Sequence, residues 1–356
     1  MKFQIVNYSD CPQWDAFVDN HPSGTLFHST SMIRAYATTH LYSPLALAAL
    51  DEKQRIHAIF AATRVGLIGA WANPFTSRSI HFAEPLFLDT PTGHKAIQEL
   101  MKIHDETSRK NSLFTEIRPI SCTQANASLW QSIGYTQKGY HNYELDLQQP
   151  IDSIWNGFTG TCRRNIKRAE RRGVTVDIVE PHTHIPTLYE ILKESYANSK
   201  IPLVDISHFS SVFRELNRQD LRLAIARLDG DVIAASCFLT DKTRVYYWYA
   251  GTKRIPGISA MASIVWDAIQ HYSKTDKKIF DFCGAGWEGE DYGPGRFKAH
   301  FGGTLTNHGR YRKVYSKWRF KLADFTYAAF RGILAPRSEE STQNKKRIQL
   351  KLPNCD

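Results

Sequence analysis

Two segments of this chain repeat one pattern, at residues 45–61 (LALAALDEKQRIHAIFA) and at residues 223–239 (LAIARLDGDVIAASCFL). In each segment an apolar run leads through an acidic turn into a second apolar run, which is typical of a β-hairpin. The two segments align almost residue for residue, although two amphipathic hairpins can also resemble each other by chance. A chain that carries one hairpin twice is expected to fold as two domains of the same topology.

Helices and strands alternate around both hairpins. The expected fold class is therefore α/β (α+β), with two tandem domains that each have a mixed sheet flanked by helices. Periodicity predicts helices at 12–18, the second half of 26–40, 99–110, 162–172, 186–198, 206–217 and 261–272, and strands at 3–6, 114–118, 140–147, 174–179, 244–250 and 279–282. Ser29 or Ser31 can cap the second of these helices, and Thr161 can cap the helix at 162–172.

A length of 356 residues is enough for two or three domains. We place the first domain at 1–149 and a second domain, which contains the candidate catalytic residues described below, at 150–314. An amphipathic helix at 315–334 mixes aromatic with basic residues, so it can rest on an anionic membrane or pack its apolar stripe on the protein. The basic polar tail at 335–356 is expected to be disordered.

The formal net charge of +10 indicates an anionic partner, such as nucleic acid, a phosphorylated substrate or an acidic membrane surface. Six scattered cysteines without CxxC spacing argue against a zinc site or a disulfide framework, and we predict no metal site. The N-terminal segment lacks the apolar core of a signal peptide, and no run approaches the ~20 apolar residues of a spanning helix. We expect a cytoplasmic protein, with peripheral contact to the inner face of the membrane as a further option.

The densest positive charge lies in the segment CRRNIKRAERR, which contains Arg163, Arg164, Lys167 and Arg168. On a helix, Arg164, Lys167 and Arg168 share one face, and their like charges repel one another. A phosphate or diphosphate partner would explain this arrangement. The alternative is a solvated face that Glu170 partly compensates.

A glycine-rich stretch from Ile279 to Gly303 (IFDFCGAGWEGEDYGPGRFKAHFGG) is the main candidate for chemistry. It begins as an apolar strand, continues as a loop that carries Trp287, and reaches the pair Phe297–Lys298. A lysine held between aromatic residues behind such a loop can bind an anionic or carbonyl group, although an ordinary surface loop also fits the pattern. Its candidate acids and bases are Asp281, Glu288, Glu290, Asp291 and His300.

The segment from Arg254 to Ser259 nearly fits the pattern with which GNAT acyltransferases hold the pyrophosphate of coenzyme A. Main-chain N–H groups at a helix N-terminus suit such an anion. Arg254, Gly257 and Ser259 would bind the cofactor if acyl-CoA were the donor. Pro256 removes one donor, and a plain turn at the start of a helix is the alternative.

Taken in order, several motifs resemble the FemABX family of tandem GNAT-fold transferases, which add amino acids to peptidoglycan precursors. The matching stretches are FTEIRPI, SIGYTQKGYHNYELDL, TCRRNIKRAERRGVTV, YYWYAGT, FDFCGAG and GRFKAHFGG, and they cover most of residues 25–305. The resemblance implies two GNAT-like domains. It departs from the family at Met32, where a tryptophan is usual, and in the lack of a coiled-coil insertion.

The resemblance also implies a reaction: aminoacyl-tRNA is the donor, and an amine on a lipid- or UDP-linked cell-wall precursor is the acceptor. Phe297 and Lys298 match the family's Phe-Lys pair at the reacting centre, where a fixed ammonium can stabilise an oxyanion. Asp281 or Asp291 would position the amine or accept its proton. Tyr249 resembles the tyrosine that lines the acceptor site, and Lys200 a basic residue that binds precursor phosphate.

Other candidate contacts complete this picture. Trp287 is a candidate for substrate binding, and the basic helix would hold phosphates of the tRNA or of the precursor. No cofactor is expected, because the acyl donor is a co-substrate. Two alternatives remain open: an acyl-CoA-dependent N-acyltransferase of exopolysaccharide, capsule or cell-envelope synthesis, and a non-catalytic RNA-binding module on the same fold. The identity of the amino acid, the acceptor amine and the oligomeric state are also left open.

Overall fold

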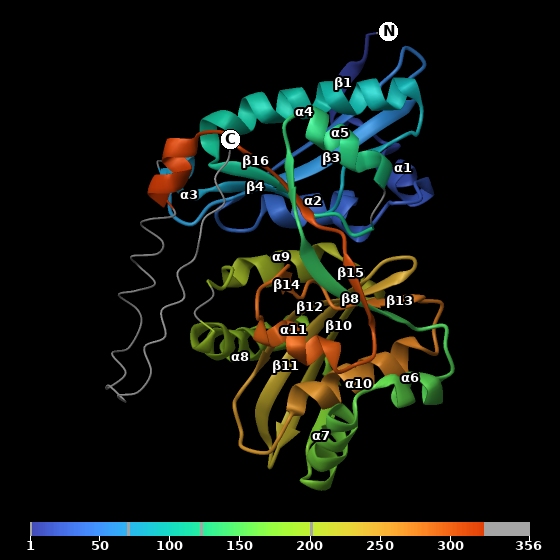
Figure 1. The fold of residues 1–356 in the computed structure, drawn as a ribbon, viewed down its shortest axis with the longest axis vertical. Helices are drawn as coiled ribbons and strands as arrows, with labels where there is room; N and C mark the ends of the chain where they lie inside the picture. Colours follow the sequence, from blue (N-terminus) through green and yellow to red (C-terminus); the bar gives the residue numbers. More distant parts are fainter. Residues whose placement is uncertain (1, 70–71, 122–123, 200–201, 324–356) are drawn as a thin grey trace.

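A computed structural model describes residues 2–69, 72–121, 124–199 and 202–323. Two mixed sheets of eight strands each lie one beyond the other along the long axis of the molecule, with helices on their faces (Figure 1). This arrangement confirms the predicted fold class.

The first sheet contains β1 (Gln4–Asn7), β2 (Tyr42–Leu50), β3 (Ile56–Val65), β4 (Arg78–His81), β5 (Leu86–Phe87), β6 (Phe114–Ile117), β7 (Thr136–Lys138) and β16 (Arg310–Val314). The second contains β8 (Tyr140–Asp146), β9 (Thr175–Val179), β10 (Leu221–Leu228), β11 (Asp231–Thr240), β12 (Arg244–Thr252), β13 (Ile279–Asp281), β14 (Gly286–Trp287) and β15 (Thr304–Asn307). The helices are α1 (Trp14–Asn20), α2 (Thr30–Ala37), α3 (Asn73–Thr76), α4 (Pro91–Asn111), α5 (Gln124–Ser132), α6 (Ile151–Gly157), α7 (Gly160–Arg171), α8 (Ile185–Asn198), α9 (Ile206–Glu215), α10 (Ala260–Tyr272) and α11 (Gly293–Ala299).

The repeated hairpin pattern reflects a repeated topology. The first sheet runs in the order β1-β2-β3-β4-β6, and the second runs in the matching order β9-β10-β11-β12-β13. In both sheets the hairpin strands pair antiparallel, and the last two strands of each series pair in parallel. The prediction of two tandem domains with one topology is confirmed.

The two sheets exchange strands. β8, which precedes the second repeat in the sequence, pairs with β13 in the second sheet. β16, which follows the second repeat, returns to the first sheet and lies between β6 and β7. The chain therefore passes twice between the sheets, and the predicted division between residues 149 and 150 stays a prediction.

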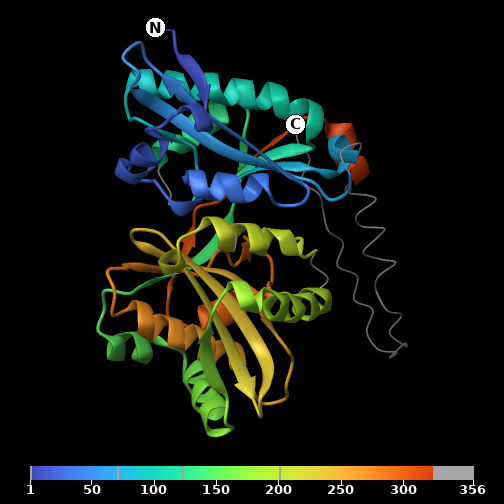
Figure 2. The same cartoon turned by 180° about the vertical axis from the view of Figure 1, so that it is seen from behind.

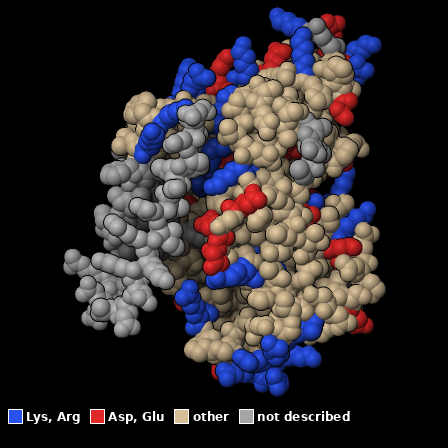
Figure 3. Space-filling view, in the orientation of Figure 1, with Lys and Arg blue, Asp and Glu red and all other residues tan. Residues whose placement is uncertain are grey.

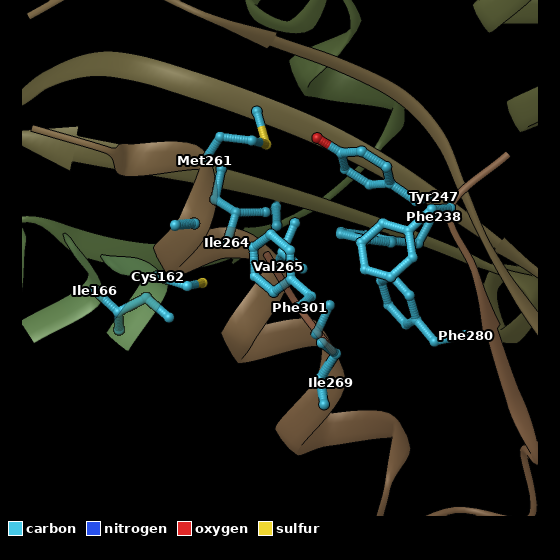
Figure 4. Close-up of a cluster of buried hydrophobic side chains, with 14 of the residues drawn as sticks. Cys162, Ile166, Phe238, Tyr247, Met261, Ile264, Val265, Ile269, Phe280 and Phe301 are labelled. Carbon is cyan, nitrogen blue, oxygen red and sulfur yellow. The ribbon is translucent and has the colours of Figure 1, made fainter. Parts of the chain in front are cut away.

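The core of the second domain forms where α10 packs on the sheet. The apolar face of α10 contains Met261, Ile264, Val265 and Ile269, and their spacing keeps all four on one side of the helix. Figure 4 shows them in one cluster with aromatic side chains such as Phe238 and Phe280. All four are buried, and burying each aliphatic side chain contributes about 1.5–3 kcal/mol. This packing fixes the position of the strands that lead into the candidate site.

A second core joins the two domains. α2 and α9 lie against each other at the junction, where Figure 2 shows them from behind. Met32 and Tyr36 of the first domain and Phe209 and Tyr246 of the second are all buried in one cluster. Met32, which stands where the resembling family usually has tryptophan, is fully buried there. The domains are therefore held together by apolar packing as well as by the exchanged strands.

Several helices begin or end at other residues than predicted. The side chain of Thr159, not Thr161, caps α7 by accepting the N–H of Cys162, so this helix begins two residues earlier than predicted. α4 extends from Pro91 because Thr90 caps it and proline is favourable in a first turn. The Phe297–Lys298 pair lies on the short helix α11, where a loop was expected.

The described part of the predicted C-terminal helix packs on the first domain. Residues 317–323 are helical; Phe320 contacts the ring of Phe114, and Arg319 donates to the carbonyls of Pro74 and Arg109. Residues 324–334 of the predicted helix and the whole tail at 335–356 lie outside the described residues. In the described part of the chain, none of the helices combines the length and the apolar character needed to cross a membrane.

Candidate active site

A cavity of about 310 Å³ lies between the two sheets and is lined from both domains. Its aromatic wall consists of Phe27, Phe82, Tyr140, Tyr196, Tyr246, Trp248 and Tyr249. Its polar and charged residues include Arg118, Asn142, Asp281, Cys283, His308 and Arg310. A neighbouring hollow of about 370 Å³ shares Tyr196 and Tyr249 with the cavity and adds Arg78, so the cleft continues beyond the two tyrosines.

Asp281 lies on the cavity floor at the end of β13. Its Oδ1 accepts hydrogen bonds from Asn142 Nδ2 and from the N–H of Cys283, each at 2.7 Å, and its Oδ2 lies 3.4 Å from Arg244. Burial raises the pKa of Asp281 above its ordinary value, against the hydrogen bond from Asn142 and the charge of Arg244, which lower it. The carboxyl group is therefore held firmly but is easier to protonate than a surface aspartate.

A second carboxylate, Glu144 of β8, joins the same network from the neighbouring strand. Its Oε1 lies 2.9 Å from His308 Nε2 and 3.2 Å from Arg244 Nη1. Burial raises the pKa of Glu144, but the hydrogen bond from His308 and the charge of Arg244 outweigh it and lower the pKa below its ordinary value. Glu144 is consequently ionised, and it orients the imidazole that lines the cavity.

The wall contributed by the first domain is basic. The buried carboxylate of Glu116 pairs with Arg118 at 2.9 Å, with Arg310 at 3.1 Å and with Arg312 at 2.6 Å. The guanidinium of Arg310 also lies 3.5 Å above the ring of Tyr140, and burial lowers the pKa of Arg310 to about 10. Three arginines around one glutamate leave a net positive charge that suits an anionic substrate group.

Lys298 lies behind the cavity, not in it. Its ammonium is buried and donates hydrogen bonds to the carbonyls of Phe282 and Gly284, and Gly284 lines the cavity. The ammonium also lies 5.6 Å from the ring of Tyr247. Burial lowers the pKa of Lys298 to about 8. A positive charge is thus placed directly behind the chain segment that forms the cavity floor.

The position of Lys298 follows from the way two parallel strands separate. β12 and β13 pair only from Arg244–Ile279 to Tyr246–Asp281, so the main-chain groups beyond Asp281 have no partner in β12. Lys298 supplies donors to the free carbonyls there. β12 also bulges at Trp248, because Tyr247 and Tyr249 pair with consecutive residues of β11.

Two further predicted residues lie at or near the cavity. Tyr249 lines it, with its ring stacked on that of Tyr196 at 6.4 Å. Trp287 lies beside the cavity wall: its ring packs edge-on against Tyr140 at 4.9 Å, and the Lys138 ammonium lies 4.7 Å from its centre. Trp287 therefore lies between the ring of Tyr140 and the ammonium of Lys138 in a cluster of aromatic and cationic side chains at the edge of the cleft.

The other predicted residues of this region lie away from the cavity. Phe297 packs against Phe301 in the core of the second domain. Asp291 is exposed and pairs with Arg296 at 2.7 Å. Lys200 lies outside the described residues.

The basic helix α7 forms a separate surface at the far end of the second domain, seen as the blue cluster at the lower end of Figure 3. Arg164, Lys167 and Arg168 are exposed, whereas Ile166 and Ala169 are buried. Arg163 differs from the others, because it donates to the carbonyls of Trp155, Asn156 and Phe158 at the end of α6. Its Nη1 therefore holds a helix terminus, a structural role that the exposed neighbours lack.

The predicted pyrophosphate loop leads into α10, with Ser259 at the N-cap position and without a side-chain cap. Gly257 has a φ of 74°, which favours glycine, and Arg254 is exposed. The guanidinium of Arg172 lies beside Gly257, so that a Cβ there would be 3.6 Å from Nη1. The end of α7 thus adds a positive charge to this loop.

Four residues at or beside the cavity were not predicted from the sequence: Asn142, Glu144, His308 and Arg310. All four come from the exchanged strands or from the loop between β15 and β16, so no local motif joins them to the glycine-rich stretch. One signal was present: Asn142 and Glu144 alternate on a strand and therefore share a face.

Cys283 offers a direct test of access to the cavity. It is an exposed cavity residue, whereas Cys11, Cys162 and Cys237 are buried. Its φ of 58° is unusual for a residue other than glycine and costs roughly 1–2 kcal/mol, which its N–H bond to Asp281 helps to offset. We expect a maleimide to label Cys283 before the three buried thiols, as read by peptide mapping. A bound substrate should slow the labelling; equal labelling of all four would contradict the described cavity.

Comparison with known proteins identifies the fold. Residues 157–298 match the family model described as acetyltransferase (GNAT) domain. The similar solved structures include FemX, at a TM-score of 0.66 and 14% identity over 90% of this chain and 99% of that chain. They also include a tandem GNAT protein from the clavulanic acid biosynthesis pathway, at 0.59 and 11% over 88% of this chain and 99% of that chain.

A third similar structure is the C-terminal domain of a putative lysylphosphatidylglycerol synthetase from Agrobacterium fabrum, at a TM-score of 0.55 and 16% identity over 90% of this chain and 97% of that chain. The structural similarity to these proteins establishes a shared fold, and the sequence identities are too low to show more than that. No curated protein sequence matches the chain.

Proposed function

We propose that this FemABX-like tandem GNAT acyltransferase transfers an aminoacyl group from aminoacyl-tRNA to an amine of a phosphorylated, lipid- or UDP-linked peptidoglycan precursor. The observation that carries the proposal is the similarity to FemX over nearly the whole of both chains, with a cavity between the two domains. The proposal places the reaction in the cytoplasm. Peripheral contact with the inner membrane face would involve residues of 315–334 that stay exposed beside the first domain, such as Lys317, Trp318 and Lys321.

The chemistry of the cavity suits aminolysis of an ester. Attack by an amine places negative charge on the carbonyl oxygen, and a preorganised positive group lowers the energy of that state. In our proposal Lys298 supplies this charge from behind Gly284, and it also fixes the floor by holding two carbonyls. Asp281 attracts and positions the acceptor amine. Arg118 and Arg310 bind an anionic group of the precursor beside the aromatic wall.

One incubation tests the proposal. The protein is mixed with total charged tRNA and with a purified UDP-linked muropeptide, and the product is read by mass spectrometry. We expect the muropeptide mass to increase by one or more aminoacyl residues, and uncharged tRNA to give no product. An unchanged muropeptide, with both UDP-linked and lipid-linked acceptors supplied, would contradict the proposal.

The exposed charges of α7 should bind phosphates of the tRNA or of the precursor. We expect the double change Lys167→Gln and Arg168→Gln to weaken tRNA binding and to reduce the slope of log K against log salt by about two, since each phosphate contact contributes ~0.9. The matched control is Lys95→Gln with Lys102→Gln, two exposed lysines on α4. Equal slopes for the two double variants, measured by fluorescence anisotropy, would show that α7 does not contact the RNA.

Acyl-CoA remains the second candidate donor, because Gly257 and the Arg172 guanidinium meet at the start of α10. If acyl-CoA is the donor, acetyl-CoA should raise the melting temperature, and the increase should grow with the ratio of its concentration to its Kd. An enzyme that uses aminoacyl-tRNA should show no such increase. The non-catalytic alternative predicts salt-sensitive RNA binding and no turnover with either donor. The incubation and the thermal shift together distinguish the three functions.

A further inference from the structure

We infer that His308 is the group that takes the proton from the acceptor amine, and that Glu144 is the residue that positions it. This inference rests on the proposed function and assigns a role that the sequence motifs did not provide. It follows from the placement of one imidazole in the cavity and from the carboxylate behind it.

The geometry of His308 is that of an oriented base. The residue lies in the loop between β15 and β16, lines the cavity, and has a side chain that is 16% exposed. Its Nε2 lies 2.9 Å from Glu144 Oε1, and no hydrogen bond to Nδ1 is formed within the described part of the chain. With Nε2–H donated to the carboxylate, Nδ1 keeps its lone pair for a substrate proton.

The carboxylates predicted for this role are less suitable. Both oxygens of Asp281 are engaged, because Oδ1 accepts two hydrogen bonds and Oδ2 faces Arg244. Asp291 is exposed and paired with Arg296, away from the cavity. The other candidate base, His300, forms a hydrogen bond with Thr159 before the start of α7 and does not line the cavity.

Charged groups of several elements surround the part of the cavity that His308 lines. They are Glu144 on β8, Arg244 on β12, Asp281 on β13, Arg310 on β16, Arg118 after β6, and Glu84 in the loop before β5. Arg244 bridges the two carboxylates of the floor, so Glu144 stays ionised and keeps the imidazole in one orientation. Burial raises the pKa of Glu84 to about 7, so its negative charge decreases below neutral pH.

The proposed step conserves atoms and charge. The lone pair of the neutral amine forms the C–N bond, and the carbonyl π electrons move to oxygen. The surplus N–H proton passes to His308 Nδ1. The C–O bond to the ribose then breaks as the carbonyl re-forms, and the imidazolium returns its proton to the ribose oxygen. The products are an amide and a free tRNA hydroxyl, and no proton is gained or lost overall.

The test compares kcat and KM of three variants in the muropeptide assay. We expect His308→Gln to lower kcat by about 10²–10⁴ with little change in KM, because general base catalysis contributes that much. In the plot of kcat against pH, the decrease at low pH should be absent from the His308→Gln variant. Glu144→Gln should lower kcat by a smaller factor than His308→Gln, because the imidazole loses the carboxylate that orients it, and Glu144→Asp should restore part of the rate. The control is His182→Gln, an exposed histidine far from the cavity lining.

A kcat for His308→Gln within threefold of the unchanged protein, with the same low-pH limb, would overturn the inference and leave the proposed function standing. If the unchanged protein itself transfers nothing, the proposed function fails, and the inference fails with it. NMR of labelled histidines in the unchanged protein gives a second measurement that does not depend on a variant's folding. We expect the Nε2–H tautomer for His308, and a neutral Nδ1–H tautomer would overturn the assignment.

Discussion

Replacing Lys298 with methionine is expected to lower aminoacyl transfer by about 10²–10³, the usual effect of removing one preorganised group that stabilises an oxyanion. Methionine is nearly isosteric but cannot donate to the carbonyls of Phe282 and Gly284, which Lys298 holds in the unchanged protein. Leaving buried acceptors unsatisfied should also lower the free energy of unfolding by about 1–3 kcal/mol. Initial rates and thermal melts measure the two effects separately.

The pH dependence of transfer provides a second check on Lys298. Burial lowers its pKa to about 8, and only the protonated ammonium carries the required charge. Transfer should therefore decrease as the pH rises above about 8, which gives the high-pH limb of a bell-shaped profile. The control is Arg296→Met on the same helix, an exposed position where neither rate nor stability should change much. A Lys298→Met variant with the rate of this control would rule out the assigned role.

Replacing Glu116 with glutamine is expected to lower the free energy of unfolding by about 3–5 kcal/mol, because removing one member of a buried ion cluster leaves the other charges unpaired. Glu116 is 2% exposed and faces three arginines, two of which come from β16. Its loss should loosen the returning strand as well as the basic wall of the cavity. Thermal or urea unfolding measures the change.

The effect of Glu116 should depend on pH in a definite direction. Burial raises the pKa of Glu116, but the charges of Arg118, Arg310 and Arg312 outweigh it and hold the pKa well below its ordinary range. A carboxylate with a lowered folded-state pKa contributes its full stability above the unfolded pKa of ~4.3 and loses it as the pH falls further. The difference in the free energy of unfolding between the unchanged protein and Glu116→Gln should therefore decrease at acidic pH. Glu106→Gln, an exposed change on α4, should melt like the unchanged protein; an equally small effect for Glu116→Gln would contradict the prediction.

Much of the fold was predictable because the two repeats satisfy local rules twice. The apolar runs and acidic turns of the hairpins, capping by Ser29 and the glycine after α7 each specify a local structure that the fold retains. The cap of α7 was misplaced because two threonines two residues apart both suit that role, and only the bond from Cys162 to Thr159 decides between them.

The site was only partly predictable. Asp281 and Tyr249 line the cavity and Lys298 lies behind it, but Asn142 and His308, which line the same cavity, are more than a hundred residues apart in the sequence. Pairing of β8 with β13 and with β15 brings them together, and such register is a property of the whole sheet. Arg163 has a role that its basic neighbours did not indicate, because its Nη1 donates to carbonyls at the end of α6, and its predicted contact with phosphate stays a prediction.

The returning strand β16 has a consequence for how the protein is made. On the ribosome the first domain cannot complete its sheet when residue 138 emerges, because the strand between β6 and β7 is still unsynthesised. At about 5–20 residues per second, that gap lasts on the order of ten to thirty seconds. Until then the edges of β6 and β7 lack the strand that pairs with them in the complete sheet. Nascent chains stalled before residue 310 should therefore be more sensitive to protease in the first domain than those released after it.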